Sequence, residues 1–264
     1  MKGILYGIGV GPGDPELLTL KAIKAIAECD IIAVPDSGTE KQLALSIAHA
    51  YIGEKPVMPL DMPMTCDRAE LKKSREAAAD TIQASLDLGK NVGFLTLGDP
   101  LIYSTYSYLH ALILSRGYKA KVIPGVTSFC AAAAALGMPL CEGSQSLHII
   151  PALYENVENA LTLDGTKVLM KSGKKLSELV NQIREKNIDA KMAQRVGMDG
   201  ERLFYDLSTD IESEYFSIII VKDSNLPNAQ KNSNSTIAQK DSNPPNTQKN
   251  DNSQAVLEEV SSKQ

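Results

Sequence analysis

Gly98, Asp99 and Pro100 form the segment with the clearest potential for ligand chemistry in this 264-residue chain. They follow an apolar run over residues 92–97, which predicts a buried strand, and residues 103–105 after them all carry hydroxyl groups. Glycine lets another group approach the backbone closely, aspartate offers acceptor oxygens, and proline fixes the turn. Open α/β sheets bind ligands at the carboxyl ends of their strands. The segment therefore predicts one part of a small-molecule site.

Two more glycine-bearing turns follow predicted strands, in residues 7–15 and 123–129. The first does not fit a dinucleotide-binding G-x-G-x-x-G motif, because Pro12 or Asp14 stands where the third glycine is required. A phosphate loop of the G-x-x-x-x-G-K-[ST] type does not occur either. We expect the three turns to form one composite site; for each turn taken alone, a sharp turn without a ligand is the alternative.

Apolar runs and amphipathic segments alternate through the first half of the chain, which is typical of a parallel sheet covered by helices. The expected strands are residues 4–10, 31–34, 57–58, 92–97 and 121–123. The expected helices are a first one capped by Asp14 and running through Ile26, then residues 41–51, 67–88 and 103–116.

The second half has a different pattern. A small-residue helix is expected over residues 129–136, a second helix over 176–186, and strands at 147–150, 167–170, 190–196 and 216–221. Because no long helix separates the strands after residue 190, we expect some antiparallel pairing. The fold class is thus α/β, with an N-terminal α/β domain over 1–124 and an α+β domain over 125–223. Residues 224–264 are rich in Asn, Ser, Gln, Lys and Pro, which predicts a disordered tail with a weak helical tip at 256–260.

Composition narrows the classes of function. Hydrophobic residues make up 43% of the chain and the net charge is −5, which argues against a nucleic-acid-binding protein. No apolar run is long enough to span a bilayer, and the N-terminus resembles a first strand more than a signal peptide. The four cysteines and three histidines are scattered, so we expect reduced thiols, a cytoplasmic location and no metal site.

Three motifs occur in an order that resembles the tetrapyrrole methylase family: Val10-Gly11-Pro12-Gly13-Asp14-Pro15, Leu97-Gly98-Asp99-Pro100 and Pro124-Gly125-Val126-Thr127-Ser128. The resemblance covers residues 3–222. It implies two αβα domains that hold S-adenosyl-L-methionine, the methyl donor, in the cleft between them. The family's cofactor contacts then fall on Pro12, Leu97, Gly98, Asp99, Ile102, Thr127 and Ser128, and in the second domain near Lys171 and Val196.

Within the family, the continuation of Gly98-Asp99-Pro100 into residues 103–106 resembles the methyltransferases that act on carbon C20 of precorrin-2 or of cobalt-factor II in cobalamin biosynthesis. The resemblance implies a tetrapyrrole partner and a homodimer, whereas the expectation of no nucleic-acid or membrane partner rests on the charge and on the short apolar runs. It also implies methyl transfer from a sulfonium to carbon, for which positioning is the main requirement; the sequence identifies no catalytic base. Side chains that suit the substrate's carboxylates are Lys171, Lys174, Lys175 and Arg195, although a solvated charged surface explains each of them equally well.

Three other interpretations remain. The first is another branch of the family, namely a methylase of another precorrin position, of diphthamide or of ribosomal RNA. The acidic balance disfavours the ribosomal-RNA branch, and residues 103–106 argue against the diphthamide branch. A tetrapyrrole- or nucleotide-binding protein without activity predicts that one of the glycine motifs is broken, and none is. A dehydrogenase is disfavoured by the failed dinucleotide spacing. Tyr103, Tyr106 and Tyr108 suit stacking on a planar substrate, but at this spacing a core position is the more common role.

Overall fold

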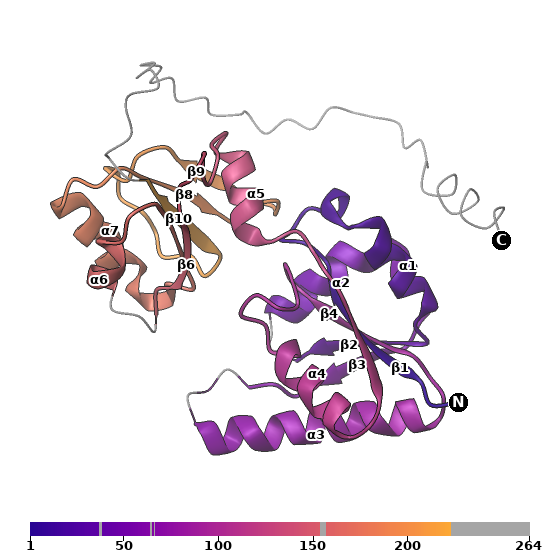
Figure 1. Cartoon of the computed structure of the whole chain (residues 1–264). Helices are drawn as coiled ribbons and strands as arrows, with labels where there is room; N and C mark the ends of the chain where they lie inside the picture. Colours follow the sequence, from indigo (N-terminus) through magenta and orange to yellow (C-terminus); the bar gives the residue numbers. More distant parts are fainter. Residues whose placement is uncertain (37–38, 64, 66, 154–156, 223–264) are drawn as a thin grey trace, which may run out of the picture. The chain divides into compact units, whose positions relative to one another are not determined.

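The computed structural model describes residues 1–36, 39–63, 65, 67–153 and 157–222. The predicted tail over residues 224–264, with its helical tip at 256–260, lies outside the described residues. Two five-stranded sheets organise the described chain (Figure 1). Both sheets belong to one compact unit. These observations confirm the predicted α/β class with two sheets.

The first sheet has the strand order β3-β2-β4-β1-β5, and every neighbouring pair is parallel, as the alternating pattern predicted. Its strands are β1 (Ile4–Gly9), β2 (Ile31–Pro35), β3 (Val57–Leu60), β4 (Val92–Thr96) and β5 (Lys119–Ile123). The helices between them are α1 (Leu20–Glu28), α2 (Thr39–Ile52), α3 (Arg68–Asp87) and α4 (Tyr106–Ser115).

The register of β1 determines where the glycine turns lie. Strand β1 runs between β4 and β5, and Gly9 pairs with Thr96 while Ile8 pairs with Ile123. The carboxyl ends of the three strands are therefore level with one another. The turns that follow them leave from the same edge of the sheet.

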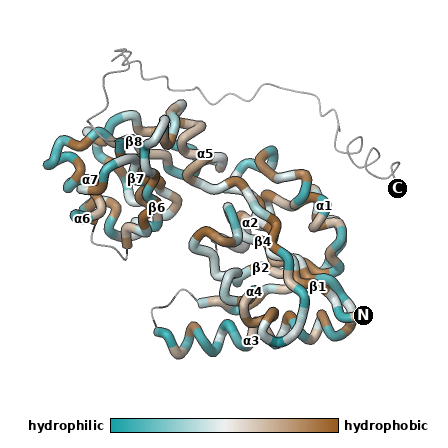
Figure 2. Tube along the Cα trace, in the orientation of Figure 1, coloured by the Kyte–Doolittle hydropathy of each residue, from teal (hydrophilic) through white to brown (hydrophobic). Residues whose placement is uncertain are grey.

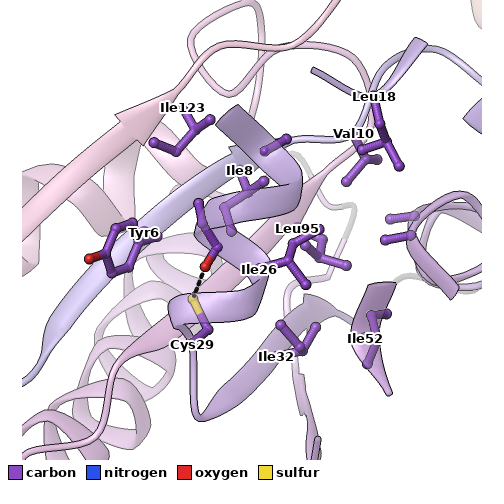
Figure 3. Close-up of a cluster of buried hydrophobic side chains, with 14 of the residues drawn as sticks. Tyr6, Ile8, Val10, Leu18, Ile26, Cys29, Ile32, Ile52, Leu95 and Ile123 are labelled. Atoms are coloured by element: carbon purple, nitrogen blue, oxygen red, sulfur yellow. Dashed lines mark hydrogen bonds between the residues drawn. The ribbon is translucent and has the colours of Figure 1, made fainter. Parts of the chain in front are cut away.

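Alternate side chains of β1 point into two buried clusters on opposite faces of the sheet. Tyr6, Ile8 and Val10 lie in the cluster shown in Figure 3, together with buried residues of α1 and α2. Leu5 lies in the second cluster, with buried residues of α3 and α4. Helices therefore cover both faces of the sheet, as a parallel sheet requires.

Cys29 belongs to the first cluster and has a structural role there. Its Sγ donates a hydrogen bond to the carbonyl oxygen of Ala25 at 3.0 Å (Figure 3). Burial is the main reason that the pKa of this thiol is raised to about 12. The thiol is therefore protonated at neutral pH and is a poor nucleophile.

Two of the expected helices start later than predicted. Asp14 caps only a 3-10 turn, Pro15–Leu17, because Leu18 is extended; α1 then begins after Thr19, whose Oγ1 accepts from the backbone N–H of Ala22 at 3.0 Å. The helix expected from residue 103 begins at Tyr106. Tyr103 has a φ of 50°, which is incompatible with a right-handed helix.

The second sheet has the strand order β6-β7-β10-β8-β9. Only β6 and β7 are parallel, and the other pairs are antiparallel, which confirms the mixed pairing expected after residue 190. Its strands are β6 (Leu147–Pro151), β7 (Thr166–Met170), β8 (Ala190–Gln194), β9 (Arg202–Phe204) and β10 (Ser217–Val221), with helices α5 (Ser128–Ala135), α6 (Val157–Leu161) and α7 (Leu176–Glu185). The sequence did not reveal β9 and α6, which are too short to show a hydrophobic period.

Helix α3 shows how the sequence pattern sets a boundary. Asp67 accepts backbone hydrogen bonds from Ala69 and Glu70 and caps the helix at the predicted position. Hydrophilic and hydrophobic colours alternate along α3, as expected for a helix with one buried face (Figure 2). In the part of the chain that the structure describes, no helix combines the length and apolar character needed to cross a bilayer.

Tyr106 anchors α4 to the first sheet. Its side chain is fully buried, and a Cβ added to Gly7 would lie 2.1 Å from its ring, so Gly7 makes the space that the ring fills. The hydroxyl donates to the carbonyl oxygen of Lys121 at 3.1 Å and lies 3.0 Å from Nδ1 of His110. Burial raises the pKa of Tyr106 well above its usual range. Tyr106 is therefore a core residue, whereas Tyr103 and Tyr108 are exposed.

Replacing Tyr106 with Phe removes this hydroxyl while keeping the ring. We expect the free energy of unfolding to fall by about 1 kcal/mol, because the carbonyl oxygen of Lys121 and Nδ1 of His110 lose their hydrogen-bond partner. The melting temperature should fall by about 2–4 °C, which differential scanning calorimetry measures. Tyr108→Phe is the matched control, since its side chain is 50% exposed, and it should leave the melting temperature unchanged. Equal melting temperatures for the two variants would contradict the anchoring role.

Candidate functional site

The three glycine turns meet at the carboxyl edge of the first sheet. Gly11, after β1, and Gly98, after β4, form an isolated antiparallel bridge. The backbone N–H of Gly98 donates to the carbonyl oxygen of Gly11 at 2.7 Å, and the reverse bond is 3.3 Å long. The structure therefore brings together the segments that the sequence analysis expected to form one site.

The glycines are required because backbone lies against backbone. A Cβ added to Gly125 would lie 2.2 Å from the carbonyl oxygen of Gly98, and one added to Gly9 would lie 2.5 Å from the nitrogen of Gly125. Real Cβ atoms do not approach backbone that closely, and Gly98 also has a φ of 71°. Each of the three turns thus depends on the absence of a side chain in its neighbour.

Asp99 joins two of the turns through its carboxylate. Oδ1 accepts from the backbone N–H of Leu101 at 2.8 Å, within its own turn. Oδ2 accepts from the backbone N–H of Gly125 at 3.1 Å, in the turn after β5. One side chain therefore fixes both the shape of its own turn and its distance from the next. Its oxygens also retain acceptor capacity, since a carboxylate oxygen has two lone pairs.

Thr127 and Ser128 follow Gly125 at the start of α5. Thr127 occupies the N-cap position, yet its side chain makes no capping hydrogen bond. Its Oγ1 is buried and, within the described residues, has no hydrogen-bond partner. A buried hydroxyl of this kind is costly unless it binds something. This orphaned oxygen and the side-chain-free glycine turns fit a polar small molecule at this edge.

Ile102 and Pro12 supply apolar surface near the turns. Ile102 is half-buried and packs, with Leu17 and Val126, against the buried cluster on the α5 side of the second sheet. Pro12 is buried in the first turn, and Leu97 packs against the core cluster of α1 and α2.

Residues of the second sheet also reach these turns. Strands β7 and β8 both run antiparallel to β10, so they end at the same edge. Lys171 follows β7, and its Nζ donates to the carbonyl oxygen of Tyr103 at 2.9 Å. Val196 is buried after β8, and a Cβ added to Gly13 would lie 2.8 Å from the backbone of the next residue, Gly197. Both second-domain residues expected at the site are thus beside segments of the first half.

Backbone strain gathers around the same residues. Tyr103, Lys171 and Arg195 have φ angles of 50°, 54° and 52°, a region that side chains other than glycine rarely adopt. Tyr103 is also held by its hydroxyl, which donates to the carbonyl oxygen of Ile149 at 3.0 Å. Strained conformations cost about 1–3 kcal/mol each and cluster at functional sites. This strain is not predictable from the sequence, because residue types other than glycine carry no local signal for a positive φ.

The four basic residues expected near substrate carboxylates do not all lie at the same place in the structure. Lys171 and Arg195 stand at the ends of β7 and β8. Lys175 lies elsewhere, since its Nζ donates to the carbonyl oxygen of Leu153 at 3.1 Å. The side chain of Lys174 is outside the described part of the structure. Among the described residues, no group of three or more His, Cys, Asp or Glu side chains is placed to hold a metal ion.

The described chain is therefore an α/β protein whose parallel sheet ends in three interlocked turns, the place where sheets of this kind bind small molecules. A family model described as tetrapyrrole (corrin/porphyrin) methylases matches residues 4–211. The chain belongs to this family. Membership confirms the predicted class, a tetrapyrrole methyltransferase that takes its methyl group from S-adenosylmethionine.

Three similar proteins place the chain within known sequences and folds. It is 34% identical to a probable cobalt-precorrin-2 C(20)-methyltransferase of Methanocaldococcus jannaschii, over 83% of this chain and 95% of that protein. It is 30% identical to a precorrin-2 C(20)-methyltransferase of Sinorhizobium sp., over 83% of this chain and 95% of that protein. The crystal structure of uroporphyrin-III C-methyl transferase from Thermus thermophilus, complexed with S-adenyl homocysteine, has a TM-score of 0.62 at 20% identity, covering 84% of this chain and 98% of that one. At this identity the structural likeness concerns the fold alone.

Proposed function

We propose that the chain transfers a methyl group from S-adenosylmethionine to carbon C20 of a precorrin-2-type macrocycle in cobalamin biosynthesis, with cobalt-factor II as the preferred substrate. The observation that carries this proposal is the meeting of the three glycine turns, which the Gly11–Gly98 bridge and the carboxylate of Asp99 hold together. The identities of 34% and 30% to C20-methyltransferases over most of the chain support the position of methylation. The higher identity, 34%, is to the protein whose name gives cobalt-precorrin-2 as the substrate, which supports the cobalt complex.

The cofactor site is proposed from the residues that the turns bring together. They are Pro12, Leu97, Gly98, Asp99, Ile102, Thr127 and Ser128, with Lys171 and Val196 from the second sheet. In this arrangement the open space beside Gly98, where an added Cβ would meet nothing within 4 Å, admits a polar ligand, and the Thr127 hydroxyl supplies a hydrogen bond to it. Asp99 acts indirectly, by holding the Gly125 turn in place.

The chemistry requires little from the protein beyond positioning. S-adenosylmethionine, when bound, supplies a methyl group that its sulfonium already activates. The residues of the three turns would hold this donor, and the task of the chain would be to keep the sulfonium methyl group in line with C20 of the macrocycle. Holding the reacting atoms in line can lower such a barrier by several kcal/mol, up to about 7–11 in ideal geometry. Lys171 and Arg195 are suited to orient the substrate through its carboxylates.

Removing the Asp99 carboxylate tests the cofactor site. In Asp99→Ala, the N–H groups of Leu101 and Gly125 lose their acceptor and the two turns are free to separate. We expect the Kd for S-adenosylmethionine, measured by isothermal titration calorimetry, to rise by a factor of about 10 or more, which corresponds to about 1.4 kcal/mol. Asp99→Asn keeps one acceptor oxygen and should weaken binding less.

The control for this experiment is Asp67→Ala, because Asp67 also accepts two backbone N–H groups, at the start of α3. Its loss should lower the free energy of unfolding by about 1 kcal/mol and leave the cofactor Kd unchanged. A wild-type Kd in Asp99→Ala would show that the cofactor binds elsewhere.

The substrate is tested by anaerobic reactions with S-adenosylmethionine, offering cobalt-factor II and metal-free precorrin-2 in parallel. Mass spectrometry should detect the gain of a single methyl group, and cobalt-factor II should react with the higher kcat/KM. Faster methylation of precorrin-2 would overturn the cobalt preference alone. If the chain binds the cofactor but methylates neither compound, the C20 proposal is wrong and another substrate of the family must be sought.

A further inference from the structure

A fourth glycine-bearing turn follows β8 in the second sheet and covers residues 195–201, Arg-Val-Gly-Met-Asp-Gly-Glu. The backbone N–H of Met198 donates to the carbonyl oxygen of Arg195 at 2.9 Å, and that of Glu201 donates to the carbonyl oxygen of Met198 at 3.1 Å. Each bond closes a β-turn, because it joins residues three apart. Two β-turns in succession bring Glu201 back towards the start of the segment. We call residues 195–201 the Gly197 turn.

The Gly197 turn packs against the first glycine turn, backbone against backbone. A Cβ added to Gly13 would lie 2.8 Å from the carbonyl oxygen of Gly197, and one added to Gly197 would lie 2.9 Å from the backbone nitrogen of Asp14. Side chains are therefore excluded from both partners, as they are between Gly9 and Gly125. The position of the Gly197 turn decides how closely the second sheet approaches the segment that carries Pro12.

The carboxylate of Glu201 closes this turn. Its Oε2 accepts a hydrogen bond from the backbone N–H of Gly197 at 2.8 Å. Asp99 makes the same kind of contact with the backbone N–H of Gly125, at 3.1 Å. In both places a carboxylate fixes a glycine that lies directly against the backbone of another turn. Hydrogen bonds to a charged acceptor are stronger than those between neutral groups.

The Gly197 turn also directs the side chain of Arg195. The Nε of Arg195 donates to the carbonyl oxygen of Asp199 at 2.9 Å, and its backbone N–H donates to the carbonyl oxygen of Phe216 at 2.9 Å. Arg195 has a φ of 52°, so these contacts hold it in a conformation that it would rarely adopt alone. The turn thus joins the edge of the first glycine turn to one of the cations suited to the substrate's carboxylates.

We propose that Glu201 is a positioning residue for cofactor binding. Its carboxylate holds Gly197 against Gly13 and Asp14 and so shapes the side of the cofactor site that the second sheet contributes. The inference rests on the proposed cofactor site, because the Gly197 turn acts through the first glycine turn. The side chain of Glu201 is exposed, so it can be replaced without opening the core.

Truncation of Glu201 tests this role. In Glu201→Ala the N–H of Gly197 loses its acceptor, and the turn is free to move away from Gly13. We expect the Kd for S-adenosylmethionine, measured by isothermal titration calorimetry, to rise by about fivefold or more. Glu201→Gln keeps an acceptor oxygen and should restore most of the affinity. In NMR spectra of the free chain, the amide signal of Gly13 should shift in Glu201→Ala and stay close to its wild-type position in Glu201→Gln.

The matched control is Asp206→Ala. Asp206 also accepts a backbone N–H with an exposed carboxylate, that of Ser208 at 2.9 Å. It lies near the opposite end of β8, since Phe204, two residues before it, pairs with Met192. Asp206→Ala should leave the cofactor Kd unchanged. Equal weakening in Asp206→Ala and Glu201→Ala, or no recovery in Glu201→Gln, would overturn the positioning role.

The Asp99→Ala variant separates this inference from the proposed function. A wild-type Kd in Glu201→Ala together with weakened binding in Asp99→Ala would overturn the role of Glu201 and leave the cofactor site standing. A wild-type Kd in both variants would overturn the cofactor site as well.

Discussion

The carboxylate of Asp99 is the interaction on which the proposed site depends most. It accepts one N–H group from its own turn and one from the turn after β5, so a single side chain sets the separation of two strand ends. The contact is possible only because Gly9, Gly98 and Gly125 bring backbone within van der Waals distance of backbone. A side chain at Gly9 or Gly125 would push the turns apart and remove the geometry that Asp99 completes, and one at Gly98 would strain its backbone, whose φ is 71°.

The rest of the first sheet holds the three turns in position. Parallel pairing on both sides of β1 brings the ends of β4, β1 and β5 level, and the helices on both faces hold that sheet rigid. Tyr106 extends the arrangement, since it fills the space above Gly7 and joins α4 to β5 through the carbonyl oxygen of Lys121. The second sheet adds Lys171 and the turn around Gly197. Lys171 and its partner Tyr103 both adopt strained backbone angles.

Much of this could be predicted from the sequence, for reasons that are local. The apolar runs, the cap at Asp67 and the three glycine turns each produce their signal within a few residues, and the strands and α3 lie where those signals placed them. The short elements α6 and β9 were not predicted, because they have too few residues to show a hydrophobic period. The division of the first predicted helix into a 3-10 turn and α1 was not predicted either. Asp14 and Thr19, five residues apart, are both residue types that cap helices, and the sequence does not show which of them starts α1.

The site was predictable in its composition but not in its contacts. Glycine content identified Gly98 and Gly125, yet only the tertiary structure shows that Asp99 spans the two turns. The left-handed conformations of Tyr103, Lys171 and Arg195 could not be predicted, because tertiary contacts impose them against local preference. The orphaned hydroxyl of Thr127 likewise becomes visible only when the burial of its oxygen is known.

The most direct test of the account is a titration of the 15N-labelled chain with S-adenosylhomocysteine, followed by NMR spectroscopy of the backbone amides. The account predicts saturable, one-to-one shifts that are largest for Gly11, Gly98, Gly125 and Thr127 and that diminish in Asp99→Ala. Shifts confined to other parts of the chain, or unchanged amide signals in the three turns at saturation, would contradict the claim that these turns form the cofactor site.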